Sequence, residues 1–366
     1  MKFTISREEL LPALQTVNGV VERRQTLPIL SNLLLNASKD GMRLTATDME
    51  VEIMATLSKN LPQGGEITLP ARKLLDICRT LPETASITIS VDGDRAQITS
   101  GKSRFTLATL PAQEYPLIEV PDQAASFTLS QAMLKSLLDR TAFAMAQQDV
   151  RYYLNGLLLE LDKGQVRAVA TDGHRLALCE VDADVSVEHP VKIIIPRKGV
   201  QELIRLLEDS DDPVKVLVSS NHVRIDLGSL RFTSKLIDGK FPDYERVIPK
   251  QSDTPILADR ETLRQSLVRA SILSNEKYRG VRITLAPNSL KALAHNPDQE
   301  EAEEEIEVEY GGGEMEVGFN VSYLLDALTN IRTDRVHITM TDPNSSCLIL
   351  PEGESPCRYV VMPMRL

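Results

Sequence analysis

A threefold internal repeat constrains the fold of this chain more than any other feature of its sequence. The segment FTIS at 3–6 returns as FTLS at 127–130, and TATD ending at Asp48 returns as VATD ending at Asp172 with the same spacing. An Arg followed by an aromatic residue opens an apolar run at equal intervals, at Arg104, Arg231 and Arg358. A fixed period indicates an architecture of similar structural units. Because 366 residues exceed one ordinary domain, we expect three such units.

Each unit is predicted to be α+β, with two helices on antiparallel sheets. Ser6 and Glu9 form a capping-box pattern that starts the first helix. Apolar residues at helical spacing predict helices over 7–17, 72–79, 131–140, 197–207, 260–274 and 321–335. Alternating runs bounded by Asp-Gly, Pro and Asn predict strands between them. Proline-containing linkers place the domain boundaries at 1–120, 121–250 and 251–366.

Composition and cysteine usage narrow the class of protein. The chain is 42% hydrophobic and 25% charged, and no apolar run approaches the roughly 20 residues of a membrane helix. The first residues show no secretion signal, so a cytoplasmic location is expected. The cysteines form no CxxC pair, and we expect neither disulfides nor a metal site nor any other cofactor. They are Cys78, Cys179, Cys347 and Cys357.

The stretch AVATDGHRLAL at 168–178 places an Asp, a His and an Arg within four residues. Asp-Gly between two apolar runs is a strong hairpin signal, and Asp172 recurs as Asp48 in the first repeat. We therefore interpret Asp172 as turn chemistry, since its side chain can bind nearby backbone. His174 and Arg175 are extra to the second repeat. They leave three readings: catalysis, an exposed hairpin, or one wall of a docking surface.

The C-terminal run YVVMPMRL favours docking. A closing core strand explains it equally well, because the same position in the other repeats is also a strand. Two methionines, a proline and Leu366 nevertheless form an adaptable apolar surface of the kind that binds several partners. We expect this segment and the 168–178 hairpin to form two walls of one groove.

Charge is unevenly distributed along the chain. The net charge is −11, yet the six predicted helices together are basic, and much of the acid lies in the run from Asp298. A Lys- and Arg-lined surface with no base-reading motif is typical of sequence-independent, salt-sensitive contact with phosphates. A solvated helix face is the alternative for any single basic pair.

Domain size suggests how such a surface is used. A domain of a third of this chain has a radius of gyration of roughly 14 Å. Three such spheres in a ring leave almost no hole, whereas six leave one about as wide as a domain. Three repeats per chain therefore predict a dimer.

Over its whole length the chain resembles the β subunit of bacterial DNA polymerase III, the sliding clamp family. The motifs that carry the resemblance are TLPILSNLLL, QDVRYYLNG, ATDGHRLA, IPRKGV, DGKFPDYERVIP, LSNEKYRGVR, GFNVSYLLDAL and YVVMPMRL. The resemblance implies a DNA clamp fold in which each chain forms half of a closed ring. It also implies a non-catalytic processivity factor in DNA replication and repair. Its partners would be duplex DNA, a second copy bound head to tail, the polymerase α subunit, the clamp loader, and other polymerases or repair proteins with short peptide motifs.

The resemblance also implies roles for individual residues. DNA-binding positions are Arg24, Gln148 and Tyr153, with Arg72, Arg197 and Lys198 as weaker candidates. The partner-peptide pocket is matched by Leu154, Thr171, Gly173, His174, Arg175, Leu176, Pro242, Arg246, Val247, Val360, Met362, Pro363 and Met364. The dimer interface is matched by Lys73, Phe105 and Leu107 on one side and Ile272, Leu273, Glu300, Glu301, Glu303 and Glu304 on the other. No catalytic or metal-binding residue is implied.

Two other functions remain open at this point. A hydrolase using Asp172 and His174 requires a nucleophile and a base that the sequence does not supply together. A peptide-binding scaffold without a DNA-encircling role shares the groove but leaves the basic helices unexplained. Retention on circular but not on linear DNA separates that scaffold from a clamp.

Overall fold

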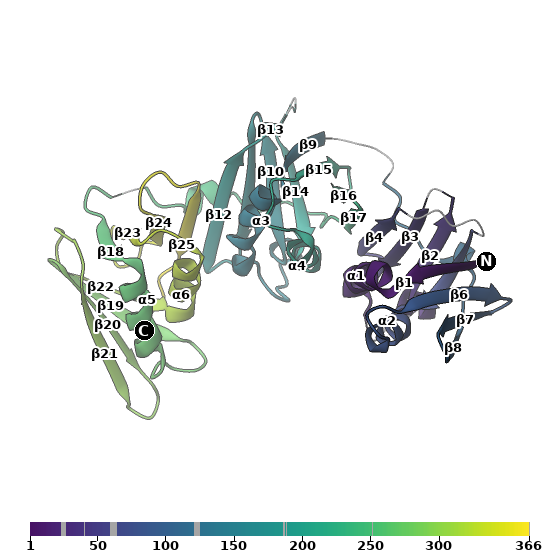
Figure 1. Cartoon of the computed structure of the whole chain (residues 1–366). Helices are drawn as coiled ribbons and strands as arrows, with labels where there is room; N and C mark the ends of the chain where they lie inside the picture. Colours follow the sequence, from purple (N-terminus) through teal and green to yellow (C-terminus); the bar gives the residue numbers. More distant parts are fainter. Residues whose placement is uncertain are drawn as a thin grey trace. The chain divides into compact units, whose positions relative to one another are not determined.

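The computed structural model describes residues 1–22, 27–39, 41–58, 64–120, 125–185, 187, 189–250 and 252–365. The chain divides into two compact units. Unit 1 joins Met1–Ala132 to Lys198–Leu236, and unit 2 joins Met133–Arg197 to Ile237–Leu366. Helices and antiparallel sheets are mixed, as predicted. The helices are α1 (Arg7–Val17), α2 (Ala71–Thr80), α3 (Gln131–Asp139), α4 (Arg197–Leu206), α5 (Arg260–Ser271) and α6 (Val321–Asn330) (Figure 1).

The first helix begins as its sequence predicts. Ser6 Oγ accepts the backbone N–H of Glu9 at 3.2 Å, and Glu9 Oε2 accepts the backbone N–H of Ser6 at 3.2 Å. This capping box satisfies two donors that a helix start leaves unpaired. The buried side of α1 then packs on α2 and on a strand of the neighbouring sheet.

Two predicted helices end earlier than their apolar pattern suggests. The last helix stops at Asn330, because Ile331 is extended and Arg335–Thr339 is a strand. The predicted end at residue 335 is therefore wrong. Similarly, α5 ends at Ser271 rather than residue 274. Apolar spacing continues past both ends because the following turn also packs on the core.

Unit 1 contains a large antiparallel sheet and a smaller one. Within the unit, the large sheet has the order β9-β15-β16-β17-β4-β3-β2-β5, and the small sheet has the order β1-β6-β7-β8. The strands of the large sheet are β2 (Asn32–Ser38), β3 (Gly41–Thr47), β4 (Val51–Leu57), β5 (Gly65–Pro70), β9 (Ala125–Ser130), β15 (Pro213–Val218), β16 (His222–Leu227) and β17 (Leu230–Lys235). Those of the small sheet are β1 (Lys2–Ser6), β6 (Ser86–Asp92), β7 (Arg95–Ser100) and β8 (Ser103–Ala108).

Unit 2 repeats this plan. An eight-stranded sheet has the order β14-β10-β11-β12-β25-β24-β23-β18, and a four-stranded sheet has the order β21-β20-β19-β22. The strands of the large sheet are β10 (Gly156–Asp162), β11 (Gln165–Thr171), β12 (Arg175–Asp182), β14 (Val191–Pro196), β18 (Ile256–Asp259), β23 (Arg335–Thr339), β24 (Cys347–Pro351) and β25 (Cys357–Val361). Those of the small sheet are β19 (Gly280–Ala286), β20 (Ser289–His295), β21 (Glu301–Glu307) and β22 (Met315–Asn320). The short elements of the two units together are β13 (Asp184–Val185), η1 (Asn18–Val20), η2 (Pro28–Ser31), η3 (Ala112–Glu114), η4 (Ala142–Ala144), η5 (Tyr152–Leu154) and η6 (Tyr244–Val247).

Each large sheet joins strands from two successive sequence repeats. In unit 1, β4 of the first repeat pairs with β17 of the second, with Ile53 opposite Phe232. In unit 2, β12 of the second repeat pairs with β25 of the third, with Leu176 opposite Val360. The Arg-aromatic sequence mark lies on the joining strand in both cases. Continuous backbone hydrogen bonding therefore ties one repeat to the next.

The second of these junctions also carries a covalent link. Cys179 on β12 and Cys357 on β25 occupy opposing positions, with Cα atoms 4.1 Å apart, and form a disulfide. The expectation that the chain contains no disulfide is therefore wrong. The two residues are 178 positions apart in sequence, and only strand pairing brings them together. Cys78 and Cys347 are buried free thiols.

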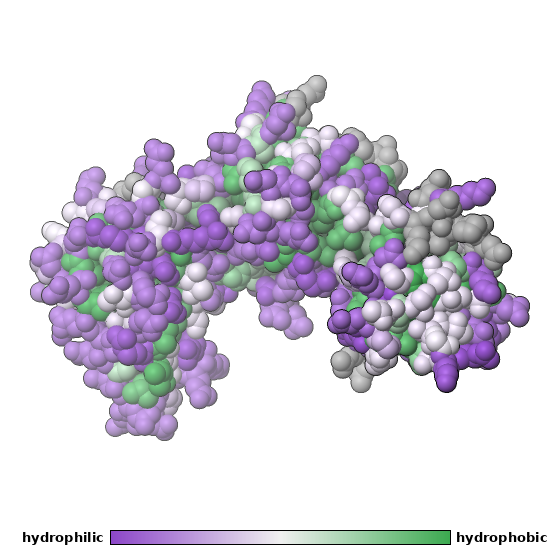
Figure 2. Space-filling model, in the orientation of Figure 1, coloured by the Kyte–Doolittle hydropathy of each residue, from purple (hydrophilic) through white to green (hydrophobic). Residues whose placement is uncertain are grey.

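Hydrophobic side chains concentrate in the interior of both units. Figure 2 shows hydrophilic residues over most of the visible surface, with smaller hydrophobic patches between them. No helix in the described ranges is long and apolar enough to cross a membrane. Within the same ranges, no cluster of His, Cys, Asp or Glu side chains could hold a metal ion.

The β4–β17 junction should be a main contributor to the stability of unit 1. Phe232 is fully buried there, so Phe232→Ala should lower the free energy of unfolding by about 3–5 kcal/mol, measured by urea denaturation. Leu27→Ala is the control, because the exposed Leu27 side chain should change stability by less than about 0.5 kcal/mol. Equal losses in the two variants would contradict this account of the junction.

Candidate functional site

The hairpin between β11 and β12 has the turn predicted for Asp172. One oxygen of this side chain, Oδ1, accepts the backbone N–H of His174 at 2.9 Å and that of Arg175 at 3.0 Å. Gly173 adopts φ +87°, a conformation that glycine tolerates best. The prediction of turn chemistry at Asp172 is confirmed.

The first repeat builds the same turn without the glycine. Asp48 Oδ1 accepts the backbone N–H of Glu50 at 2.9 Å and that of Val51 at 2.7 Å. Met49 takes the glycine's place with φ 73°. Because both repeats use the aspartate in one way, its presence in the Asp-Gly-His-Arg motif marks the fold and indicates no nucleophile.

Arg175 ties the tip of this hairpin to two other segments, η4 and α6. Its Nε donates to Asp172 Oδ2 at 3.0 Å, and a terminal nitrogen donates to the carbonyl oxygen of Phe143 at 2.9 Å. A second terminal nitrogen pairs with Asp326 of α6. The guanidinium also lies 4.6 Å from the centre of the Tyr323 ring. A planar cation with five donors can satisfy all these contacts, which lysine cannot.

The C-terminal segment runs beside the hairpin, as expected. The backbone N–H of Met362 donates to the carbonyl oxygen of His174 at 2.8 Å. Two residues later, the N–H of Met364 donates to the carbonyl oxygen of Gly318, also at 2.8 Å. The hairpin and the chain end are therefore held against one another by backbone contacts, and both methionines keep partly exposed side chains.

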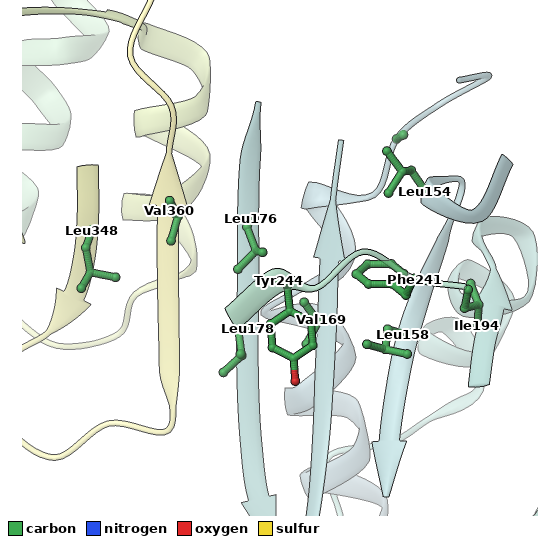
Figure 3. Packing of buried hydrophobic residues seen from close by; sticks show 11 residues of the cluster. Leu154, Leu158, Val169, Leu176, Leu178, Ile194, Phe241, Tyr244, Leu348 and Val360 are labelled. Carbon is green, nitrogen blue, oxygen red and sulfur yellow. The ribbon is translucent and has the colours of Figure 1, made fainter. Parts of the chain in front are cut away.

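A buried apolar cluster underlies this region (Figure 3). Three residues predicted for the pocket, Leu154, Leu176 and Val360, belong to it. Figure 3 shows the segment carrying Phe241 and Tyr244 crossing in front of the neighbouring strands. Sequence reasoning missed the other members of the cluster, although their alternating apolar runs were a usable signal. These are Ala146, Leu158, Val169, Leu178, Ile194, Phe241, Tyr244 and Leu348.

A polar network anchors the crossing segment at Tyr244. The Tyr244 hydroxyl donates to Glu160 Oε2 at 2.6 Å and accepts from a terminal nitrogen of Arg167 at 2.9 Å. Burial, together with the Glu160 carboxylate, raises the pKa of Tyr244 to about 12. Burial alone would lower the pKa of Arg167, but its bonds to Tyr244 and Glu180 outweigh burial and raise it. Arg167 therefore stays charged at neutral pH, and the network holds Tyr244 over the cluster.

Two of the remaining predicted pocket residues, Pro242 and Met364, line separate cavities. Pro242 lines a cavity of about 390 Å³ together with Lys192 and Phe241. Met364 lines another, of about 370 Å³, together with Tyr278. Arg246 and Val247 are exposed on η6, Thr171 is buried, and Pro363 is half-buried. We call 171–176, 242–247 and 360–364 together the candidate peptide site.

The predicted DNA-binding residues differ in how free their side chains are. Arg24 lies outside the described residues. Lys198 already pairs with Glu22 and Asp48, and Arg72 donates to the carbonyl oxygen of Val21 at 2.7 Å. Burial would lower the pKa of Lys198, but these two carboxylates outweigh it and raise the pKa.

The other DNA-binding candidates belong to unit 2. Arg197 donates to the carbonyl oxygen of Met145 at 3.1 Å. Gln148 is held at φ 56°, and Tyr153 packs partly against the buried cluster. The fold therefore holds the side chains of Arg197 and Tyr153 and the backbone of Gln148 in place.

The residues predicted for the dimer interface lie on α2, on strand β8, at the end of α5 and at strand β21. Ile272 is 73% exposed at the end of α5, which is unusual for so large an apolar side chain. Phe105 and Leu107 lie on the edge strand β8. Lys73 is exposed on α2, and Leu273 is half-buried. Glu301, Glu303 and Glu304 lie on the edge strand β21, with Glu300 just before it.

Three family models match successive parts of the chain. They describe the N-terminal, central and C-terminal domains of the DNA polymerase III beta subunit and match residues 1–119, 128–243 and 245–365. The chain belongs to the DNA polymerase III beta subunit family. A beta sliding clamp of Pseudomonas putida is 53% identical, with both chains fully covered.

Solved structures show the same relationship. The crystal structure of a DNA polymerase sliding clamp from Pseudomonas aeruginosa with ligand superposes with a TM-score of 0.98 at 52% identity, covering both chains completely. A second structure from this organism, bound to griselimycin, gives 0.97 at 52% identity and the same coverage. The chain therefore has the three-domain clamp fold. This family is a non-catalytic processivity factor of DNA polymerase III, so a hydrolase at Asp172 and His174 is excluded.

Removing the Asp172 carboxylate should loosen the hairpin tip. In Asp172→Ala, the amides of His174 and Arg175 lose their acceptor, so their hydrogen exchange should accelerate and the free energy of unfolding should fall by about 1–2 kcal/mol. The control is Asp162→Ala at the β10–β11 turn, whose side chain, within the described ranges, accepts only from the adjacent Lys163 amide. Unchanged exchange at residues 174 and 175 would rule out this role for the aspartate.

Proposed function

We propose that two copies of the chain join head to tail into a closed ring that encircles duplex DNA and tethers the replicative polymerase to it. The observation that carries the proposal is a pair of edge strands, β8 and β21, each at the end of a four-stranded sheet. Membership of the DNA polymerase III beta subunit family supports it. Domain boundaries at 1–120, 121–250 and 251–366 are part of the proposal.

The chain forms two junctions between repeats, and the strands for a third junction are left at sheet edges. Both large sheets consist of two half-sheets, joined by β4–β17 and by β12–β25. Strand β8 carries the same Arg-aromatic mark as β17 and β25, at Arg104 and Phe105. Strand β21 holds the place in the third repeat that β4 and β12 hold in the other two. Pairing of β8 with β21 of a second copy is the missing third junction, and two such junctions close a symmetric ring.

The side chains at these edges are complementary. Strand β21 is strongly acidic, whereas Arg104 is exposed on β8 and Lys73 is exposed on α2. Lys291 and Arg269 already pair with Glu303 and Glu304, at 3.2 and 2.6 Å. Glu301 is therefore the partner we propose for Lys73. Burial of Ile272 on closure would remove a large apolar side chain from water and favour the dimer.

Contact with DNA is proposed to be electrostatic and independent of sequence. The sequence contains no base-reading motif, and phosphate contacts carry no sequence information by themselves. Lys198, Arg72 and Arg197 must exchange their internal partners for phosphate, so we expect Arg24 and Gln148 to contribute more. An acidic chain binds duplex weakly by such contacts, and ring closure then supplies the lasting association.

The candidate peptide site is proposed to bind short segments of the polymerase α subunit, the clamp loader and other DNA-processing proteins. Its apolar base is buried and anchored, and the rim is formed by adaptable methionines at 362 and 364. Rigid apolar pockets with a few polar groups suit peptides whose anchors supply most of the binding energy. A relative with 52% identity has been solved bound to griselimycin, which shows that such a clamp accepts a ligand.

The dimer should depend on the exposed end of α5. Replacing Ile272 and Leu273 together by alanine removes apolar area from the proposed contact, so sedimentation velocity at micromolar protein should show a shift from dimer to monomer. Val150→Ala, at another strongly exposed apolar residue, should leave the dimer intact. A monomeric wild-type protein at this concentration would refute ring closure.

Encirclement should make retention depend on DNA topology. After loading, the protein should remain on a nicked circular duplex and dissociate rapidly once the circle is cut, as measured by gel filtration. Arg24→Ala should reduce the salt dependence of duplex binding by about one unit of slope, whereas Arg95→Ala on β7 should not. Equal retention on linear DNA, or none on the circle, would favour the scaffold without a DNA-encircling role.

A further inference from the structure

Unit 1 contains a surface pocket that none of the proposed functions uses. It has a volume of about 180 Å³ and is formed by the turn between β3 and β4, the segment 116–119, and the facing ends of β16 and β17. Met49 and Leu117 line it, and they are 41% and 52% exposed. Large apolar side chains that share one hollow and remain in water mark an interaction site more often than isolated ones do.

The wall formed by 116–119 is held in place by buried polar contacts. The backbone N–H of Ile118 donates to Glu52 Oε2 at 3.0 Å, and Glu52 itself is buried. The hydroxyl of the preceding Tyr115 accepts the backbone N–H of Thr47 at 3.1 Å and donates to the carbonyl oxygen of Asn32 at 3.3 Å. The pocket is therefore formed before any ligand arrives, which lowers the entropy lost on binding.

His222 is a buried polar residue in the wall of this pocket. The residue lines the pocket and is 7% exposed. Its Nδ1 lies 2.8 Å from Asn221 Oδ1, and because that oxygen can only accept, Nδ1 carries the proton. Burial and the nearby Lys235 charge lower the pKa of His222, so the ring is neutral at neutral pH and Nε2 is an acceptor.

Among the described residues, that acceptor has no partner. Nε2 of His222 is buried without a hydrogen bond. A buried polar atom left unpaired is destabilising, and a donor that reaches it recovers the lost free energy. The matching group therefore combines a large apolar body with a single N–H donor and no acceptor, a combination that the indole of tryptophan provides.

We propose that this pocket binds a tryptophan side chain presented by a segment of a partner protein. The indole N–H donates to His222 Nε2, and the ring packs on Met49 and Leu117. The partner is a different protein, because this chain contains no tryptophan and a second copy cannot supply one. Lys235 and Glu119 on the lining are available for the polar groups that flank the anchor in the partner's segment.

The test uses N-acetyltryptophanamide as the probe and its 1-methylindole analogue, which lacks the donor. Both are titrated into full-length protein labelled with carbon-13 at the methionine methyls. We expect the Met49 methyl to shift, with roughly fivefold weaker binding for the methylated probe, the effect of one hydrogen bond. Shifts confined to Met362 and Met364, or equal affinity for the two probes, would overturn the proposal.

Two variants separate the acceptor from the apolar wall. His222→Phe should bind both probes equally, since it removes the acceptor and keeps a ring of similar size. Leu117→Ala tests the pocket without risk to folding, because the side chain is exposed, and should weaken both probes by roughly threefold or more. Leu27→Ala, another exposed leucine of unit 1, should change neither affinity. Unaltered binding in Leu117→Ala would place the probes elsewhere.

Discussion

Backbone hydrogen bonding between successive repeats is the interaction on which this structure depends. The β4–β17 and β12–β25 ladders make one continuous sheet from two half-sheets, and each half-sheet alone would expose an unpaired edge. An open edge is a site for association with further strands. The chain closes two of these junctions internally and leaves β8 and β21 at its small sheets. The proposed ring is based on these two edge strands, because a third junction of the same kind would pair β8 with β21 of a second copy.

The candidate peptide site is a direct product of the β12–β25 ladder. Pairing of these strands brings the last residues of the chain to the tip of the 168–178 hairpin, where Met362 donates to His174. Two further constraints stabilise the junction: the Cys179–Cys357 disulfide and the guanidinium of Arg175, which binds the hairpin, η4 and α6 together. The site therefore combines a rigid base with half-exposed methionines. Such a base and such a rim suit the proposed binding of different peptides.

Charge in this protein has a structural role as well as a proposed binding role. Lys198 on α4 is engaged with carboxylates of its own chain, and Arg269 on α5 pairs with Glu304. A count of basic residues on helices therefore overstates the charge available to phosphate. The opposite case is His222, whose buried Nε2 has no partner in the part of the chain that the structure describes. Satisfied charges indicate architecture, whereas an unsatisfied polar atom in the wall of a pocket indicates a place for a ligand.

The sequence by itself determined what depends on neighbouring residues. Apolar spacing predicted two helices per domain. Local motifs predicted the capping box of Ser6 and Glu9 and the Asp172 turn, because a cap or a turn joins residues only two or three positions apart. The end of α6 was wrong because apolar spacing continues where the backbone does not. Tertiary structure alone decided the disulfide of Cys179 and Cys357, the partners of Lys198 and the pocket at His222. Each of these joins segments distant in sequence, and their proximity results from strand pairing and packing that no local pattern encodes.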